Sequence, residues 1–565
     1  MTVFQWFIFF LVIQVIHFLA TWKLYQKAGR KSWEAAIPVY NGIILMKIIN
    51  RPTWWTILLF VPVVNLIMIP VVWVETIRSF GKNSTLDTVL VLVTLGFYIF
   101  FINYTQDVTY ITNRSLQSTT QVGDTVSSLL FAIVVATLVH TYVMQPFTIP
   151  TSSLEKSLLV GDFLFVSKFH YGARTPMTPV AAPMVHDTLP LLNTKSYSKW
   201  PQLPYFRFPA LQSIERNDIV VFNWPVDTVY KFFDRSGRKA DKPIDKKSNY
   251  VKRCVGVPGD NFSIKDGYVY INNSKLELPE RAKVQYHYVV VFKEPAYGAI
   301  LEENKIIEYL PYYSIPSKVW DKPEVKEYLT NGKNTTFLQE ITRDSSAVVV
   351  TGNITQEDFR KLGMNYSQLA GEINMTEELK NQLAKDPRVA SITKVVREKD
   401  NSTFPQTGDW SIDNFGPIYI PEAGKEIAIN TENLPLYKRI IEEYEHNDLK
   451  INGDQILING EIATNYTFKQ DYYWMMGDNR HRSEDSRYWG FVPADHIVGK
   501  PVFIWLSLDQ YVPWSKAIDK IRWERMFTTV GGEGQPYSYF KFFLIALAAY
   551  FGISFYMKKK KQKAA

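Results

Sequence analysis

The sequence predicts a mainly-β domain that is anchored in a membrane by about five transmembrane helices and carries an inserted α+β subdomain. Three features of the 565 residues support this fold class. Dense apolar runs approach the roughly 20 residues that a membrane-spanning helix needs. Short β-branched and aromatic runs fill the region between the last two apolar runs. A more polar stretch with helical periodicity interrupts that region, and we expect it to form the insertion.

Five apolar runs are the predicted membrane spans. They are Val3–Thr21, Trp54–Val74, Thr88–Asn103, Val126–Met144 and Tyr537–Tyr556. The first run is not expected to be a cleaved leader, because no charged segment precedes it and no small-residue cleavage site follows it. The second contains prolines, which predict a kinked span.

Lysine and arginine residues orient the predicted spans. Six basic residues against one glutamate lie between Trp22 and Trp55, and five lysines follow the last run. Cytoplasmic flanks of membrane helices carry such an excess. We therefore expect an external amino terminus, external residues 145–536 and a cytoplasmic tail, 557–565. The net charge of the whole chain is +8, so the remainder is slightly acidic and gives little support for nucleic-acid binding.

The external region reads mainly as strands, with helix-like stretches in its polar part. The expected strands are Phe163–Val166, Ile219–Phe222, Tyr250–Val255, Tyr268–Ile271, Tyr286–Phe292, Gln455–Ile458 and Val502–Trp505. The expected helices are Glu357–Leu369, Thr376–Lys385 and Leu436–Tyr444. The chain then divides into a multi-span region (1–125), an anchor (126–144), a β domain (145–275 and 470–530), an inserted subdomain (276–469), a last span (537–556) and the tail.

Metal and disulfide chemistry have no support in the sequence. The single cysteine, Cys254, excludes an intrachain disulfide. The eight histidines show no metal-ligand spacing, and there is no HExxH motif. We expect neither a metal nor a cofactor.

Ser153 is a candidate nucleophile because it lies a few residues beyond the fourth apolar run. A serine hydroxyl is a weak nucleophile unless a base takes its proton. Lys156 completes an S-x-x-K pattern, but the chain lacks the K-T-G motif of the penicillin-binding enzymes that use it. The alternative is that the hydroxyls of Thr151, Ser152 and Ser153 cap a turn, which is the interpretation we favour for Ser152.

Lys252 is the better candidate base. In a strand it shares one face with Tyr250 and Cys254, while Arg253 faces the other way as a surface or structural charge. Burial on that face would lower the lysine pKa toward neutrality, and only the neutral amine can accept a proton. Taken alone, the segment favours a lysine that reaches solvent from a strand edge over a catalytic base.

A polar turn follows much later in the chain. Gly477–Arg480, with Ser483, Asp485 and Arg487, lies between two apolar segments. Such a turn forms either a structural ion-pair network or a support that orients a catalytic base.

The order of these segments resembles bacterial type I signal peptidases, the leader peptidases. The matching segments are Ile149–Lys168, Asp218–Phe222, Tyr250–Asp260 and Gly477–Pro493. The resemblance implies a signal-peptidase-like β fold and a membrane-bound serine endopeptidase. Such an enzyme removes N-terminal signal peptides from exported preproteins after small residues in an Ala-X-Ala-like pattern. Residues 1–120 and most of 275–470 lie outside the resemblance.

The resemblance also implies roles for individual residues. Ser153 would be the nucleophile and Lys252 the general base of a Ser/Lys dyad. The Thr151 hydroxyl and the Ser153 N–H would form the oxyanion hole. Ser483 would position the lysine amine, supported by the ion pair of Asp485 and Arg487, and the substrate pockets would be lined by Ile149, Leu154, Tyr250 and Val251. The chain departs from the family pattern at Ser152, Leu154, Lys156 and Ser157.

The implied location is the cytoplasmic (inner) membrane, with the catalytic domain on the external or periplasmic face. The expected partners are signal-peptide-bearing preproteins and the lipid bilayer, with the protein-export translocon as a candidate. An alternative function is a catalytically silent membrane assembly or chaperone factor on the same scaffold. The multi-span region and the insertion favour that alternative, whereas the presence of both dyad residues argues against it.

Overall fold

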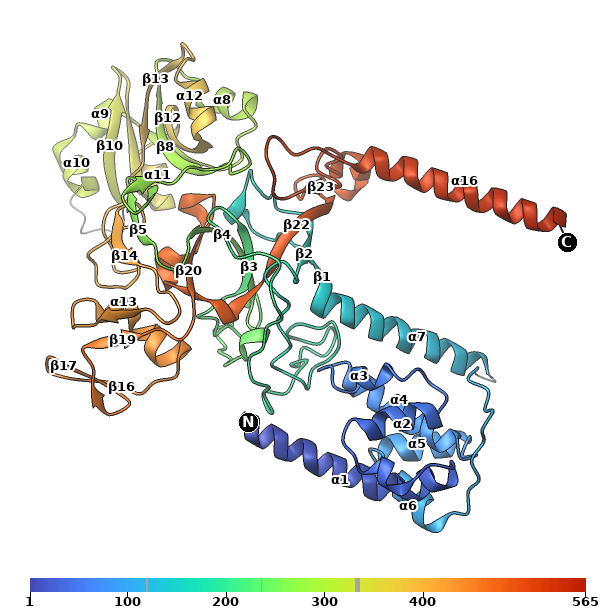
Figure 1. Ribbon diagram of the computed structural model, residues 1–565. Helices are drawn as coiled ribbons and strands as arrows, with labels where there is room; N and C mark the ends of the chain where they lie inside the picture. Colours follow the sequence, from blue (N-terminus) through green and yellow to red (C-terminus); the bar gives the residue numbers. More distant parts are fainter. Residues whose placement is uncertain (118–119, 235, 331–335, 565) are drawn as a thin grey trace.

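The computed structural model describes residues 1–564 apart from 118–119, 235 and 331–335. The helices at both ends of the chain lie to one side of a part built from β-sheets, and the C-terminal helix extends apart from the others (Figure 1). These helices are α1 (Val3–Lys27), α2 (Tyr40–Ile48), α3 (Trp55–Leu58), α4 (Asn65–Arg78), α5 (Thr85–Val93), α6 (Tyr98–Thr105), α7 (Gln121–Leu138) and α16 (Phe540–Ala564).

Three helices, not the predicted five, are long and apolar enough to cross a membrane among the described residues. They are α1, α7 with its π-helical extension to Val143, and α16. The predicted second span is divided between α3 and α4, because the chain turns through Pro62 and through Val63 in a left-handed conformation (φ 69°). The predicted third span is α5 and α6, bent by 118° at Leu95-Gly96, where both φ values are positive. This pair is at most one broken span.

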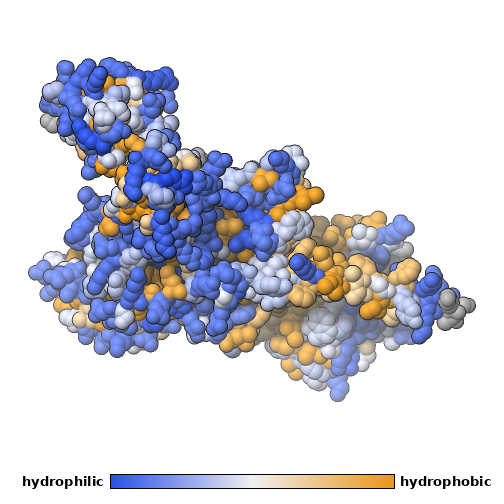
Figure 2. Space-filling view, turned by 90° about the horizontal axis from the view of Figure 1, so that it is seen from above, coloured by the Kyte–Doolittle hydropathy of each residue, from blue (hydrophilic) through white to orange (hydrophobic). Residues whose placement is uncertain are grey.

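The three long helices run in roughly the same direction away from the sheets (Figure 1). The amino-terminal end of α1 lies at the sheet part, where Trp6 Nε1 donates a hydrogen bond to the Gln202 carbonyl (2.9 Å). Apolar side chains gather over the helical end of the molecule, whereas the sheet end is mainly hydrophilic (Figure 2).

The central sheet has the order β1-β2-β22-β3-β4-β20-β21, and β23 adds to β22. Its strands are β1 (Met144–Thr148), β2 (Asp162–Ser167), β3 (Ile219–Asn223), β4 (Asn249–Gly256), β20 (Tyr472–Met476), β21 (Val492–Pro493), β22 (Ile497–Ser507) and β23 (Thr528–Thr529). All the pairings are antiparallel. Early strands (β1 to β4) and late strands (β20 to β22) alternate in this sheet, so segments several hundred residues apart become neighbours.

A six-stranded sheet, β10-β11-β9-β12-β8-β13, lies beside the central sheet. Its strands are β8 (Gln285–Phe292), β9 (Tyr309–Pro316), β10 (Phe337–Arg343), β11 (Ala347–Asn353), β12 (Asn365–Thr376) and β13 (Val389–Lys394). Its helices are α8 (Tyr297–Glu303), α9 (Ser317–Trp320), α10 (Pro323–Thr330), α11 (Gln356–Lys361) and α12 (Glu377–Leu383). The helix predicted over Glu357–Leu369 is half correct, because α11 ends before Gly363 at φ 63° and the chain continues as β12.

The remaining strands form smaller sheets. They are β5 (Asn261–Lys265), β6 (Tyr268–Ile271), β7 (Ser274–Lys275), β14 (Phe415–Tyr419), β15 (Glu426–Ala428), β16 (Leu449–Asn452), β17 (Gln455–Ile458), β18 (Glu461–Ile462) and β19 (Asn465–Thr467). The short helices α13 (Leu434–Arg439), α14 (Ser486–Trp489) and α15 (Ala517–Lys520) complete the fold. Because β14 pairs with β5, part of the segment 276–469 joins a sheet with the segment before it. The single inserted subdomain with these bounds is therefore not confirmed.

Candidate active site

Ser153 lies in a short 3₁₀ turn that follows β1. The turn, Ser152–Leu154, is held by Leu154, which is 1% exposed in the apolar cluster that also contains Ile149. The Ser153 carbonyl accepts a hydrogen bond from the backbone N–H of Asn479 (3.0 Å). The apolar anchor and the hydrogen bond fix a serine that is only 7% exposed.

Lys252 lies on β4, with strand β3 on one side. Its Nζ and the Oγ of Ser153 are 2.6 Å apart. The lysine is 4% exposed and shares its side of the strand with the buried Cys254 and with Tyr250, whose ring centre lies 5.4 Å from Nζ. The predicted burial of Lys252 is therefore confirmed, and Lys252 rather than Lys156 makes the hydrogen bond with Ser153.

Burial lowers the pKa of Lys252 to about 8, although the nearby carboxylates of Asp485 and Glu484 act in the opposite direction. The charged ammonium is poorly solvated in this position, which favours the neutral amine. A neutral amine at hydrogen-bonding distance from a hydroxyl can take up its proton, as a general base does. The arrangement is therefore chemically able to activate Ser153.

The polar turn after β20 is a fully buried ion-pair network. Asp485 accepts hydrogen bonds from Arg487 Nε and Nη2 (both 2.9 Å), and neither side chain is more than 1% exposed. Asp485 also accepts the Gly477 N–H (3.0 Å), and Arg487 donates to the Arg480 carbonyl (2.5 Å). Burial alone would raise the pKa of Asp485, but the Arg487 charge and hydrogen bonds hold it below its ordinary value. The carboxylate therefore stays ionised near Lys252.

Ser483 is buried at the same turn, 5% exposed. A side chain at Gly477 would collide with Ser483 Oγ and would come within 2.5 Å of the Ser153 carbonyl, so this glycine allows the close approach of the two serine segments. The Ser483 hydroxyl has no hydrogen-bond partner of ordinary geometry in the part of the chain that the structure describes, but it lies close enough to Asp485 to help lower the pKa of that carboxyl. Its role in positioning Lys252 stays a prediction.

The remaining predicted site residues surround this pair. Thr151 is exposed at the start of the 3₁₀ turn, and its side chain does not cap that turn. Ile149 and Leu154 are buried in one apolar cluster, against which Val251 packs. Tyr250 stacks on Trp224, with ring centres 5.0 Å apart. Their roles in the oxyanion hole and the substrate pockets stay predictions.

The sequence did not predict a second buried ion pair, between Arg253 and Asp478. Arg253 donates to both oxygens of Asp478, over 2.8 and 2.6 Å, and the two side chains are almost completely buried. Ser157 Oγ also donates to Asp478 (2.5 Å). The pair of Arg253 and Asp478 therefore joins β4 to the polar turn and, through Ser157, to the segment after Ser153. Strand alternation placed Arg253 opposite Lys252, but only the pairing of β4 with β20 shows its partner.

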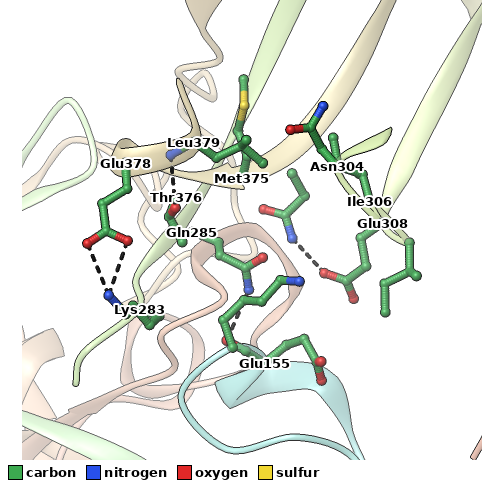
Figure 3. Close-up of a pocket in the computed structure, with 13 residues that line it drawn as sticks. Glu155, Lys283, Gln285, Asn304, Ile306, Glu308, Met375, Thr376, Glu378 and Leu379 are labelled. Carbon is green, nitrogen blue, oxygen red and sulfur yellow. Dashed lines mark hydrogen bonds and ion pairs between the residues drawn. The ribbon is translucent and has the colours of Figure 1, made fainter. Parts of the chain in front are cut away.

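The six-stranded sheet also reaches the Ser153 turn. Asn479 Nδ2 donates to the Ser152 carbonyl (3.0 Å) and to Glu308 Oε2 (2.7 Å). Asn374 Nδ2, on β12, donates to Asn479 Oδ1 (2.8 Å) and to the same glutamate (2.6 Å). A cavity of about 300 Å³ lies beside these bonds, and Glu155, Gln285 and Glu308 are among the residues that line it (Figure 3). Nothing in the sequence patterns pointed to this contact.

No group of three or more His, Cys, Asp or Glu side chains is arranged to hold a metal ion among the described residues. Burial raises the pKa of the Cys254 thiol, which disfavours its reactive thiolate.

Comparison with known proteins identifies the family at this point. The model of the family described as signal peptidase, peptidase S26, matches residues 122–335 and 420–506, together more than half of the chain. The chain belongs to this family. The S26 match leaves out residues 336–419, which contain β10 to β13. Residues 33–113 match a second model, a family of unknown function (DUF5684).

Individual relatives of this S26 protein include several proteins named Signal peptidase I. The protein from Rickettsia massiliae (strain Mtu5) is 29% identical over 153 residues, 27% of this chain and 44% of the relative. The one from Rickettsia felis (strain ATCC VR-1525 / URRWXCal2) has the same values. The one from Buchnera aphidicola subsp. Schizaphis graminum (strain Sg) is 24% identical over 397 residues, 68% of this chain and 75% of the relative. The match therefore spans less than half the length of these Rickettsia relatives.

Proposed function

We propose that this protein is a membrane-bound serine endopeptidase that removes N-terminal signal peptides from exported preproteins. The observation that carries the proposal is the buried hydrogen bond between Lys252 Nζ and Ser153 Oγ, 2.6 Å long. Membership of the signal peptidase family and the names of the relatives support it.

In the proposed mechanism, neutral Lys252 takes the Ser153 proton while Oγ attacks the carbonyl carbon of the scissile bond. The negative charge moves to the carbonyl oxygen, where the Thr151 hydroxyl and the Ser153 N–H donate hydrogen bonds. Loss of one such donor typically costs about 3–4 kcal/mol of transition-state stabilisation. The protonated lysine then gives its proton to the leaving amine. A water molecule, deprotonated by the same lysine, releases the signal peptide from Ser153.

The substrate would bind as an extended strand near both residues. β1 lies at an edge of the central sheet, and the ladder between β4 and β20 extends only as far as Arg253. The Tyr250–Lys252 half of β4 is therefore available for backbone hydrogen bonds of the kind that recognise extended peptides. The apolar cluster of Ile149, Leu154 and Val251 would accept small side chains, which favours cleavage after an Ala-X-Ala-like pattern.

We infer further that the sheet part faces the exterior of the cytoplasmic membrane. Trp6 binds the sheet part, so the opposite end of α1, with Lys23 and Lys27, points away from it. The lysines at the end of α16 also lie at the far side (Figure 1). Basic residues favour the cytoplasmic side. Three spans, like five, give an odd number of crossings, so the orientation expected from the sequence is retained.

The decisive experiment is cleavage of a purified preprotein by the full-length enzyme in detergent. We expect Ser153→Ala and Lys252→Ala each to lower kcat/KM by at least about a thousandfold, as for other residues that act as one catalytic unit. Lys156→Ala is the matched control and should remain close to wild type, and melting curves should show all three variants folded. Loss of activity only in Lys156→Ala would assign the base to the S-x-x-K lysine. A folded wild-type protein that cleaves no preprotein would favour a silent assembly factor.

A further inference from the structure

A second cavity, of about 140 Å³, lies where α7 meets the central sheet. It is lined by residues at the end of α7 and its π-helical extension, by the segment after β2, and by the 3₁₀ turn Ile244–Lys246. The α7 contribution includes Thr137, His140 and Thr141. None of the candidate active-site residues lines this cavity.

The lining is rich in groups that can carry positive charge. Three basic side chains, Lys168, Arg174 and Lys246, line the cavity, whereas Asp245 is the single carboxylate in the lining. Burial lowers the pKa of His186, which also lines the cavity, to about 4, so this histidine adds no charge at neutral pH. Asp245 already accepts the backbone N–H of Thr178 (2.9 Å) and its hydroxyl (2.6 Å). The cavity therefore has an excess of positive charge.

Two of these ammonium groups lack a carboxylate partner. Within the described residues, neither Lys168 nor Lys246 forms an ion pair within 4.0 Å, and only the more distant carboxylates of Asp245 and Asp187 act on Lys246. Lys246 is 8% exposed and lies 5.5 Å from the ring centre of Tyr197. Burial, together with the charges of Arg174 and Arg207, lowers the pKa of Lys168 to about 7. An ammonium in such surroundings is destabilised unless an anion approaches it.

We propose that this cavity binds a phosphate group, supplied by the headgroup of an anionic phospholipid. Phosphate oxygens accept strong charge-assisted hydrogen bonds from ammonium and guanidinium groups. The cavity lies at the end of α7, a candidate membrane span, and therefore at the depth where headgroups are found. Val139 and Val143 on the same segment, each 44% exposed, offer an apolar surface to the acyl chains. A cavity of this size accommodates one phosphate group rather than a nucleotide.

Such a lipid would join the membrane span to the sheet. Thr137 and His140 belong to the helical segment, whereas Lys168 follows β2 and Lys246 precedes β4. One phosphate bound between them would hold these elements together in an orientation fixed relative to the membrane surface.

The test compares the full-length protein in a neutral detergent with the Lys168→Gln/Lys246→Gln variant. Phosphatidylglycerol, phosphatidylcholine and inorganic phosphate are each added at equal concentration. Native mass spectrometry gives the lipid Kd, and melting curves give the Tm. We expect phosphatidylglycerol to raise the Tm of the wild type, and the double variant to bind it at least about tenfold more weakly. Lys265→Gln, at an exposed position of β5, is the control and should bind as the wild type does.

The lipid-free samples separate binding from a structural role. Removal of these two unpaired cations should leave the lipid-free Tm unchanged or higher, whereas a structural role would lower it. Lys168→Arg/Lys246→Arg keeps both charges and should retain binding. Equal Kd values for wild type and Lys168→Gln/Lys246→Gln would overturn the site. An equal Tm shift with inorganic phosphate would overturn the lipid source, and equal binding of phosphatidylcholine would overturn the preference for anionic lipid.

Discussion

At the scale of single residues, the protonation state of Lys252 controls the proposed chemistry. We predict that kcat/KM rises from acid pH up to a pKa of about 8, because only the neutral amine can accept the Ser153 proton. Free lysine titrates more than two pH units higher. The measurement is a pH–rate profile with one preprotein at constant ionic strength. An acid limb centred above pH 10 would show that burial does not activate this lysine.

The same lowered pKa makes stability depend on pH. Between the folded pKa of about 8 and the unfolded value of 10.5, the unfolded chain binds more protons, so stability rises with pH across this window. Below pH 8 the buried lysine destabilises the fold by roughly 3 kcal/mol, and above 10.5 this contribution vanishes.

We therefore predict that Lys252→Met stabilises the protein relative to the wild type, and that this gain in the free energy of unfolding is about 3 kcal/mol larger at pH 7 than at pH 10.5. Denaturant titrations of both proteins in the same detergent would measure the gain. The comparison between the two proteins cancels other groups that titrate in this range. A gain that does not change with pH would contradict the prediction.

The residue types at the site could be predicted from the sequence, but most of their partners could not. Alternation along one strand placed Lys252 beside Tyr250 and Cys254, which requires only local geometry. The bond between Arg253 and Asp478 depends on the pairing of β4 with β20, and no short-range pattern encodes that pairing. Residues that are joined only by tertiary contacts were accordingly missed.

At the scale of elements, β12 supports the Ser153 turn from a different sheet. Asn374 binds Asn479 and Glu308, and Asn479 binds the Ser152 carbonyl. We predict that Asn374→Leu destabilises the fold by about 1–3 kcal/mol, because it leaves buried polar groups without a partner. It should also lower kcat more than it raises KM, since small displacements of a nucleophile reduce the rate strongly.

The matched control for this prediction is Asn365→Leu, an exposed position of the same strand. It should leave both the Tm and kcat close to wild type. Equal kinetics for the two leucine variants would show that β12 has no influence on the Ser153 turn.

Elements were predicted well where the local pattern was sufficient. The strands β2, β3, β4, β6, β8, β17 and β22 lie where β-branched and aromatic runs predicted them. The membrane spans were overcounted, because hydropathy measures apolar content and not chain direction. Pro62 and Leu95-Gly96 turn the chain inside apolar runs, and this divides each run into short helices.

At the scale of the whole molecule, the three candidate membrane spans give a testable topology. Cys254, the single cysteine, is buried, so a thiol reagent would label only a cysteine introduced at an exposed position. We predict that Asn273→Cys reacts with a membrane-impermeant maleimide in intact cells, whereas Ser115→Cys reacts only after permeabilisation. Both side chains are exposed, so access to the reagent depends on the side of the membrane. If α5 and α6 together made a fourth crossing, the pattern would reverse: Ser115→Cys would react in intact cells and Asn273→Cys only after permeabilisation.

The alternation of early and late strands in the central sheet also sets when the proposed active site can form during synthesis. β2 needs β22 as a neighbour, and β4 needs β20, so strands made early stay incomplete until residue 507 has been translated. At roughly 5–20 residues per second, the ribosome needs tens of seconds to pass from Ser153 to β22. During that interval Ser153 and Lys252 lack the sheet that holds them together. If the Ser153–Lys252 pair is the active site, the nascent chain would stay inactive until β22 has been made, and this delay would need no propeptide.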